Sequence, residues 1–185
     1  MWNKVYYNKN WYNLDLTWDD PLNNLKNNVI YDYFMISDER MFLDHVEDNF
    51  SFETPEAADD TKSYYAVNKK YAEDLDSAKS ILGSSIITAA KNNNTVLRLQ
   101  CSTEDVYDEL VDYLAGDELY SLLTSAKDSS NKNLVDTTFN YAMNDGQYTA
   151  IILIFYKNTS LSKYYSNTDI LSKDTKKALK AYGIK

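Results

Sequence analysis

Residues 2–21, WNKVYYNKNWYNLDLTWDDP, carry the most informative pattern in the chain. Aromatic or aliphatic residues alternate with polar ones on both sides of residues 8–10, which read Asn-Lys-Asn. Alternation with a period of two across a short asparagine-rich break is typical of a β-hairpin. Pro21 ends the pattern, because proline cannot donate a hydrogen bond to a sheet. We therefore predict a hairpin over residues 2–18.

A strand and a short helix are predicted next. Residues 22–30 are an asparagine-rich loop, and residues 31–36 are aromatic and aliphatic enough for a strand. Ser37 can then cap the N-terminus of a helix that runs to about His45. The following residues are acidic, contain Pro55 and have no apolar period, so we place a first unit at residues 1–48 and a linker at residues 49–63.

The second predicted unit covers residues 64–160 and alternates strands with helices. Apolar residues at helical spacing predict helices over about 75–90 and over 102–114, the latter continuing past Gly116 to about Leu123. Residues 144–147, Asn-Asp-Gly-Gln, are the strongest hairpin signal in the chain. The predicted strands cover residues 64–71, 95–101, 135–143 and 148–156.

The predicted fold class is α+β. The order β-α-β-α-β-β in residues 64–160 indicates an α+β sandwich domain. Residues 161–185 form a basic tail, with an amphipathic helix expected over about 173–182.

Composition and charge exclude several kinds of function. The formal net charge of −9 argues against a nucleic-acid-binding protein with a broad basic surface, although residues 163–185 hold six lysines against two aspartates. No apolar run is long enough for a membrane span. The 17 tyrosines, with many asparagines and lysines, are typical of an AT-rich genome, and a tyrosine-lined sugar or peptide surface is the alternative explanation.

The hairpin resembles the bacterial transglutaminase-like family of the cysteine-peptidase superfamily. In that family a His-x-Trp-Asn strand leads into a Trp-Tyr-x-x-Asp-x-Thr-Trp-Asp-Asp-Pro strand. The residues that match the two motifs are Met1, Trp2, Asn3, Trp11, Tyr12, Asp15, Thr17, Trp18, Asp19, Asp20 and Pro21. Residues 33–38 and His45 are similar to the family's Tyr-Phe-x-x-Ser-Asp segment with its trailing histidine. The resemblance covers about a quarter of the chain, and residues 64–185 carry no signature of a family.

The resemblance implies a hydrolase or acyltransferase that acts on protein or peptide amides. The family uses a cysteine nucleophile, a histidine base and a carboxylate that orients the histidine. Asp15 takes the place of that orienting acid, and Trp2, Asn3, Trp11, Tyr12, Thr17 and Trp18 support the motif. The family's histidine would stand directly before Met1 and its cysteine further upstream. The resemblance therefore implies a truncated protein, a remnant hairpin, strand and short helix, that is inactive in this chemistry by itself.

The chain's own histidine and cysteine have simpler explanations. Cys101 follows the motif instead of preceding it, and a buried structural thiol is the expected role. His45 is the only histidine, and a structural or solvated role is expected more than a base or a metal ligand. Without the resemblance, Asp15 would be expected to accept a hydrogen bond from a backbone amide or a tyrosine. No cofactor and no metal site is predicted, since one histidine and scattered carboxylates do not make a zinc or calcium site.

Two other functions remain open from the sequence. The Trp11-Tyr12 pair suggests a cell-wall or carbohydrate-binding module, but one copy of the motif and only 4 glycines count against it. Residues 64–160 could instead bind a protein partner. Self-association through residues 2–18 is a further hypothesis, because unpaired strand edges recruit other chains. The first residues do not resemble a signal peptide, so an extracellular or cell-surface location would require an upstream signal.

Overall fold

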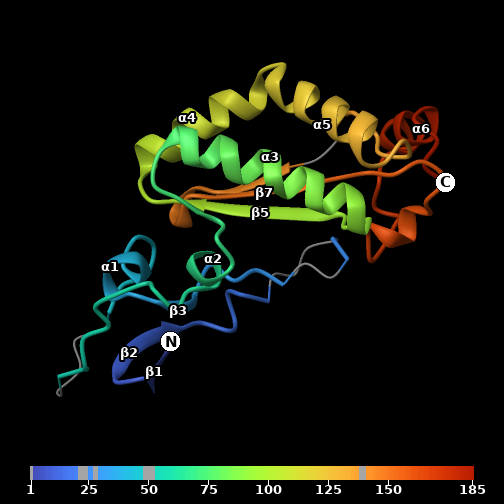
Figure 1. The fold of residues 1–185 in the computed structure, drawn as a ribbon. Helices are drawn as coiled ribbons and strands as arrows, with labels where there is room; N and C mark the ends of the chain where they lie inside the picture. Colours follow the sequence, from blue (N-terminus) through green and yellow to red (C-terminus); the bar gives the residue numbers. More distant parts are fainter. Residues whose placement is uncertain (1, 21–24, 27–28, 48–52, 138–140) are drawn as a thin grey trace.

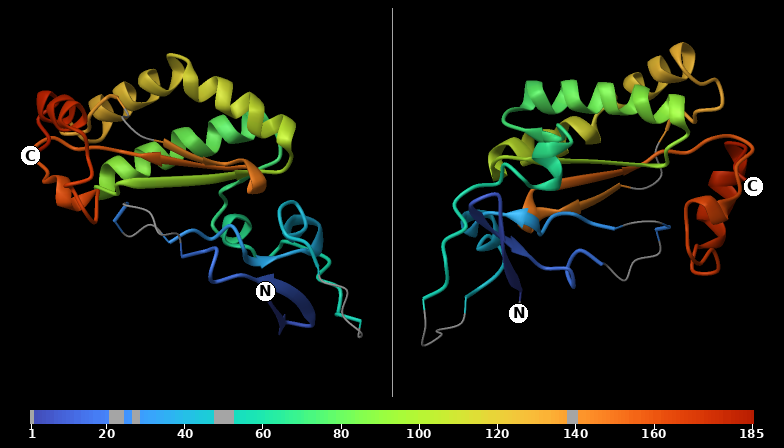
Figure 2. Two further views of the ribbon diagram at one scale, coloured as in Figure 1. Left: turned by 180° about the vertical axis from the view of Figure 1, so that it is seen from behind. Right: turned by 60° about the horizontal axis from the view of Figure 1, so that its bottom comes forward.

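Two small sheets organise the computed structural model, which describes residues 2–20, 25–26, 29–47, 53–137 and 141–185 (Figure 1). The first sheet has the strand order β1-β2-β3, and the second has the order β4-β5-β7-β6. Helices α3, α4 and α5 cover one face of the second sheet, and the first sheet lies beyond its other face (Figures 1 and 2). The α+β class predicted from the sequence is confirmed.

The predicted hairpin is present, but it is shorter than residues 2–18. Strands β1 (Asn3–Tyr7) and β2 (Asn10–Leu14) pair antiparallel with Tyr7 opposite Asn10. Asn8 and Lys9 both have positive φ, 48° and 73°, as the tight turns of two-residue hairpins require. Residues 15–18 form a turn in place of the expected strand, because the carboxylate of Asp15 binds the backbone amides that follow it.

The next two elements stand where the sequence places them, and both are shorter. Strand β3 (Phe34–Ile36) pairs with β2, and helix α1 (Asp38–Met41) follows it. The hydroxyl of Ser37 accepts a hydrogen bond from the Arg40 amide, which confirms the predicted N-cap. The helix ends before His45, so His45 lies in the irregular segment beyond it.

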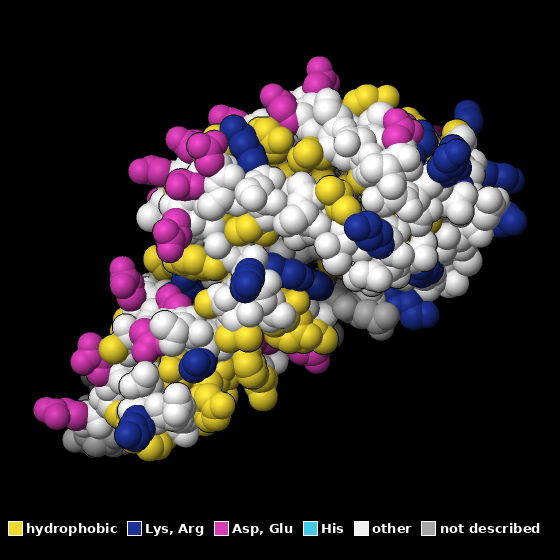
Figure 3. Space-filling view, in the orientation of Figure 1, with side chains coloured by type: hydrophobic (Ala, Val, Ile, Leu, Met, Phe, Trp, Pro, Cys, Tyr) yellow, Lys and Arg dark blue, Asp and Glu magenta, His cyan; other side chains and the backbone are white. Residues whose placement is uncertain are grey.

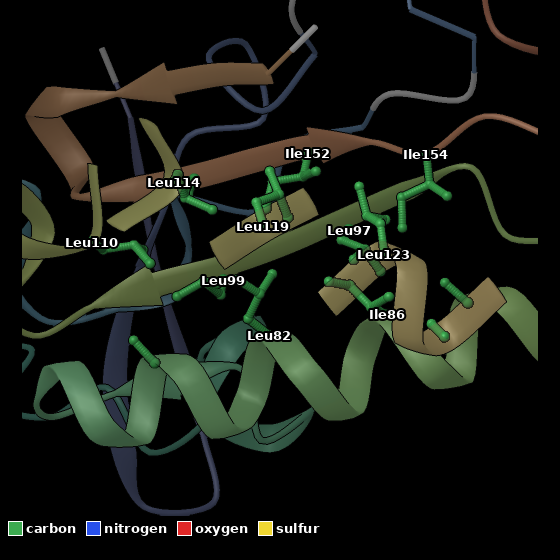
Figure 4. Packing of buried hydrophobic residues seen from close by; sticks show 14 of the residues in the cluster. Leu82, Ile86, Leu97, Leu99, Leu110, Leu114, Leu119, Leu123, Ile152 and Ile154 are labelled. Atoms are coloured by element: carbon green, nitrogen blue, oxygen red, sulfur yellow. The ribbon is translucent and has the colours of Figure 1, made fainter. Parts of the chain in front are cut away.

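The helical layer of the second unit follows the predicted pattern. Helix α3 (Leu75–Asn92) and strand β5 (Val96–Cys101) agree with the apolar spacing of the sequence. The single helix expected after residue 102 is two helices, α4 (Glu104–Ala115) and α5 (Glu118–Ser129), which meet at Gly116 and Asp117. Their apolar stripes pack on the sheet with α3 (Figure 4). The labelled core side chains are Leu82, Ile86, Leu97, Leu99, Leu110, Leu114, Leu119, Leu123, Ile152 and Ile154.

The strand predicted over residues 64–71 is wrong for most of its length. Residues Tyr64–Val67 form helix α2, because the Ser63 hydroxyl accepts a hydrogen bond from the Ala66 amide and caps the turn. Only the two-residue strand β4 (Tyr71–Ala72) reaches the sheet, where it runs parallel to β5. Aromatic residues in this stretch are typical of strands, but the local capping interaction favours the helix.

The last two strands also differ in detail from the prediction. Strands β6 (Tyr141–Asn144) and β7 (Thr149–Leu153) are antiparallel, and a 3-10 turn, η1 (Asp145–Gln147), joins them. Part of the strand expected over residues 135–143 lies outside the described residues. The tail continues through η2 (Leu161–Lys163) to helix α6 (Lys173–Ala181), which confirms the predicted C-terminal helix. Among the described helices, none has the length and apolar composition needed to cross a membrane.

Polar side chains join the two sheets. Asp32, just before β3, is fully buried and accepts hydrogen bonds from Tyr65, Thr149 and Asn144. Arg40 of α1 donates to backbone carbonyls at the end of β5 and in η1. The predicted boundary between residues 1–48 and 64–160 remains a prediction, and these contacts show that the two parts share a buried polar layer.

Candidate functional site

Asp15 is held at the end of β2 with its side chain turned inward. The residue is only 3% exposed. One carboxylate oxygen, Oδ1, accepts hydrogen bonds from the backbone amides of Thr17 (2.9 Å) and Trp18 (3.1 Å). Its own amide donates to the carbonyl of Tyr33, which ties the residue to the segment before β3. The backbone-amide role considered for Asp15 from the sequence is therefore present in the fold.

The other oxygen of Asp15 faces the only histidine of the chain. His45 Nε2 lies 3.4 Å from Asp15 Oδ2, and His45 Nδ1 lies 2.7 Å from Asp44 Oδ1. Aromatic rings enclose the imidazole: the ring centroid of Trp18 lies at 4.4 Å, that of Tyr33 at 5.0 Å and that of Trp2 at 5.4 Å. The sequence did not predict this pairing. The similarity of residues 33–45 to the family segment was a signal for His45, but it gave the residue no position relative to Asp15.

Asp44 is fixed by further hydrogen bonds. The hydroxyl of Tyr33 donates to Asp44 Oδ2 at 2.7 Å, and the Gln147 amide donates to Asp44 Oδ1 at 3.1 Å. Burial raises the pKa of Tyr33, and its hydrogen bond to the Asp44 carboxylate raises it further. The tyrosine therefore keeps its proton and acts as a donor in this cluster.

The geometry limits what His45 can do. Both of its ring nitrogens face carboxylate oxygens, so a doubly protonated ring can donate to both. No ring nitrogen is left to take a proton from a substrate, which a general base requires. Asp15 is different: its Oδ1 accepts two amides and its Oδ2 one imidazole, and a carboxylate offers about four acceptor positions. Among the described residues, one acceptor position on Asp15 Oδ2 receives no donor.

The motif-supporting residues surround this cluster or stabilise the hairpin. Trp2 Nε1 donates to Asn13 Oδ1 at 3.0 Å, and Trp11 packs on Tyr6 with a centroid distance of 5.2 Å. Tyr12 is buried, and Trp18 is half-exposed beside His45. Asn3 lies opposite Leu14, and Thr17 contributes its backbone amide to Asp15.

Cys101 lies close to this region through its backbone, because its carbonyl accepts a hydrogen bond from Arg40. It ends β5, is fully buried, and belongs to the apolar core beneath the helices. Burial raises the pKa of its thiol to about 12. The thiolate is the reactive form of cysteine, so this environment gives no activated nucleophile. Among the described residues, no group of three or more histidine, cysteine, aspartate or glutamate side chains is arranged to hold a metal ion.

The reactivity of Cys101 provides a direct measurement. Because the pKa of the thiol rises from 9.0 to about 12, the thiolate fraction at pH 8 falls about a thousandfold, and alkylation by iodoacetamide should slow by at least that factor relative to the unfolded chain. Mass spectrometry of the labelled chain, with and without denaturant, measures the ratio. Labelling of the folded chain at the rate of a free thiol would contradict the buried placement.

Asp19 gives the fold a defined pH dependence. Its Oδ1 accepts the Tyr33 amide at 3.0 Å, its Oδ2 is buried without a hydrogen-bond partner among the described residues, and burial raises its pKa from 3.8 to about 7. Between about pH 4 and pH 7, the folded state therefore keeps the Asp19 proton, whereas the unfolded state has already lost it. The free energy of unfolding should fall across this window as pH rises, by as much as ~1.4 kcal/mol per pH unit from this group.

The variant Asp19→Asn keeps an acceptor for the Tyr33 amide and removes the titration. We expect it to match the wild type near pH 4 and to be the more stable of the two at pH 8, in urea unfolding followed by fluorescence. Asp76→Asn, in the first turn of α3, is a control on the helical layer and should leave the pH profile unchanged. Parallel pH profiles for Asp19→Asn and the wild type would show that Asp19 does not carry the effect.

Comparison with known proteins assigns no family to this chain. A scan of the chain against protein-family models found no match, and a search of curated proteins found no significant match.

Proposed function

We propose that the chain carries the acid-bearing part of a transglutaminase-like acyl-transfer site. The parent activity is that of a cysteine peptidase or acyltransferase acting on protein or peptide amides, with Asp15 as the acid that orients a catalytic histidine. The observation that carries the proposal is the buried Asp15 carboxylate, in which backbone amides hold one oxygen and the other faces an imidazole. By itself the chain is not expected to turn over, because its one cysteine is buried and its one histidine has both nitrogens occupied.

The register of the hairpin supports this role. Asn3 pairs with Leu14, so Trp2 and Asp15 are the next positions opposite one another. Opposite residues of an antiparallel pair point to the same face, and residues two apart on one strand share a face. The family's histidine stands two positions before Trp2, and a strand continued that far would place it on the face of Asp15. Diagonal neighbours of this kind are within reach of long or aromatic side chains.

The surface around the site also supports it. Large apolar side chains near His45 are exposed: Trp18 is 51% exposed, Phe42 is 42% exposed and Val46 is 88% exposed. Hydrophobic side chains gather over the part of the molecule that holds β1–β3 (Figure 3). Exposed apolar side chains gathered on one part of a surface can mark a place where another element packs. In a complete acyl-transfer core, the part that carries the nucleophile would cover it.

The proposal is tested on the genomic DNA upstream of the Met1 codon. It predicts an in-frame histidine codon directly before Met1 and a cysteine codon further upstream. A chain expressed from that upstream region should release ammonia from glutamine peptides or hydrolyse peptide amides, and Asp15→Ala should lower kcat at least a hundredfold, as expected when an acid no longer orients the histidine. The 185-residue chain, and its Cys101→Ala variant, should show no turnover. An in-frame stop codon directly upstream, or turnover that depends on Cys101, would contradict the proposal.

A second candidate function is a binding module. Tyr6 and Tyr7 at the end of β1 are more than half exposed, and aromatic rings on a surface suit sugars or peptides. The ligand would be a cell-wall polysaccharide or a protein, and a second copy of the chain is a further candidate through the hairpin. Pull-down on cell-wall material tests binding to the polysaccharide, and sedimentation analysis tests self-association. Both measurements are repeated on the double variant Tyr6→Ser and Tyr7→Ser. Unchanged binding and unchanged mass in the double variant would exclude the hairpin as the contact.

A further inference from the structure

The Asp15 site is connected to the second sheet through Gln147. This residue belongs to η1, between β6 and β7, and it is fully buried. Its side-chain amide donates to Asp44 Oδ1 at 3.1 Å and to the carbonyl of Arg40 at 3.2 Å. Residues more than a hundred positions apart in the sequence are therefore in direct contact at the site. The second unit provides one of the hydrogen bonds that fix Asp44.

The turn that carries Gln147 is packed tightly against Asp44. A Cβ atom on the neighbouring Gly146 would lie 2.7 Å from Asp44 Oδ2, closer than a carbon and an oxygen can approach. On its other side, the same oxygen accepts the hydroxyl of Tyr33 at 2.7 Å. The Asp44 carboxylate thus contacts both Tyr33, just before β3, and the turn η1, and its orientation depends on both units.

The imidazole of His45 connects Asp44 to Asp15. The Nδ1–Asp44 distance of 2.7 Å is much shorter than the Nε2–Asp15 distance of 3.4 Å. A charge-assisted hydrogen bond at the shorter distance is the stronger one, so Asp44 determines the orientation of the ring. Trp2, Trp18 and Tyr33 pack around the ring and restrict other orientations. Nε2 then points toward Asp15 Oδ2, while the amides of Thr17 and Trp18 hold the other oxygen, Oδ1.

We infer that His45 and Gln147 are positioning residues for the Asp15 carboxylate, in a relay from Gln147 through Asp44 and His45 to Asp15. The second unit is then part of the site and not only an appended domain. The chemical role of the relay rests on the proposed function of Asp15. The relay itself is a set of contacts within this chain, so it is tested without any enzymatic activity.

The single histidine makes the test specific. Labelling the full chain with ¹⁵N-histidine gives NMR signals from the His45 ring alone. The ring N–H signals are recorded at pH 5, and the exchange of each N–H with solvent is measured. We expect both protons to be protected in the wild type. Gln147→Met should change the Nδ1 shift and speed exchange of the Nε2 proton, which faces Asp15, by about tenfold.

Gln100→Met is the matched control. Gln100, in β5 of the second sheet, is a buried glutamine like Gln147. The Oε1 atoms of both residues lack a partner among the described residues, but the Gln100 amide contacts Thr149 instead of Asp44. This variant should leave both ring signals unchanged even if it destabilises the fold. Asp44→Asn, which keeps the side-chain shape, should reproduce the effect of Gln147→Met.

If Gln147→Met and Asp44→Asn leave the exchange of the Nε2 proton unchanged, or if Gln100→Met changes it equally, the relay is wrong. Because these measurements need no substrate, they can fail while the upstream-extended chain is active. Equally, the relay can hold while that chain is inactive, which would contradict only the proposed function.

Discussion

Replacing Arg40 by methionine is expected to lower the free energy of unfolding by about 3 kcal/mol or more, because several buried acceptors lose their donor and each unsatisfied buried group costs ~1–3 kcal/mol. The guanidinium is 5% exposed and donates to the carbonyls of Cys101, Ser102 and Gln147, each at 3.3 Å. It also donates to the hydroxyl of Tyr71 at 3.2 Å and lies 3.6 Å from Asp60. Methionine fills much of the volume but leaves these acceptors without a donor.

Urea unfolding followed by tryptophan fluorescence measures this loss, since all three tryptophans lie in the first unit. Arg40→Lys should recover only part of it, because one ammonium cannot reach acceptors arranged for a planar guanidinium. Lys127→Ala is the comparison: it breaks a 2.6 Å ion pair with Asp136 in which both side chains are more than a fifth exposed. Such a pair contributes about 1 kcal/mol or less. Similar losses for Arg40→Met and Lys127→Ala would show that Arg40 does not join the two sheets.

The sequence predicted the elements whose signals are local. Helix α3, strand β5 and helix α6 follow directly from apolar periodicity, and the turn at Asn8 and Lys9 follows from the asparagine-rich break in a period-two alternation. The error at residues 64–71 has a local cause as well. Aromatic residues there suggested a strand, while the cap provided by Ser63 determined a helix.

The contacts that form the candidate site are not local, which is why the sequence did not reveal them. Asp15 was identified as a candidate from its motif, but His45 lies 30 residues later and Gln147 lies 103 residues after Asp44. Neither periodicity nor propensity contains information about such distances in sequence. Nothing in the sequence marks a polar residue as buried either: Arg40 stands in a predicted helix and Asp32 in a predicted strand, and only the fold shows that both are buried.

Asp32 provides the second large effect. Its carboxylate accepts hydrogen bonds from Tyr65 (2.7 Å), Asn144 (2.7 Å) and Thr149 (3.0 Å), and burial raises its pKa. Asp32→Ala removes the acceptor for two buried donors and one half-buried donor, and we expect a loss of about 3 kcal/mol, since each unsatisfied buried group costs ~1–3 kcal/mol and some can relax. Asp32→Asn should cost less, because the hydroxyls of Tyr65 and Thr149 can rotate to accept from its amide. Thermal and urea unfolding of both variants measure which of the two substitutions costs more stability.

A double-mutant cycle on Asp32 and Tyr65 then measures how strongly the two parts of the chain are coupled. The hydrogen bond joins the segment before β3 to α2, so Asp32→Ala and Tyr65→Phe should be non-additive by at least 0.5 kcal/mol, the lower end for residues in contact. Asp32→Ala combined with Ser121→Ala, an exposed change on α5, should be additive within that limit.

If the Asp32–Tyr65 coupling is also near zero, the polar layer does not connect the sheets energetically. A chain shortened to residues 60–185 should then unfold cooperatively with the midpoint of the full protein. A coupling of 1 kcal/mol or more would instead require the hairpin and the second sheet to unfold as one unit.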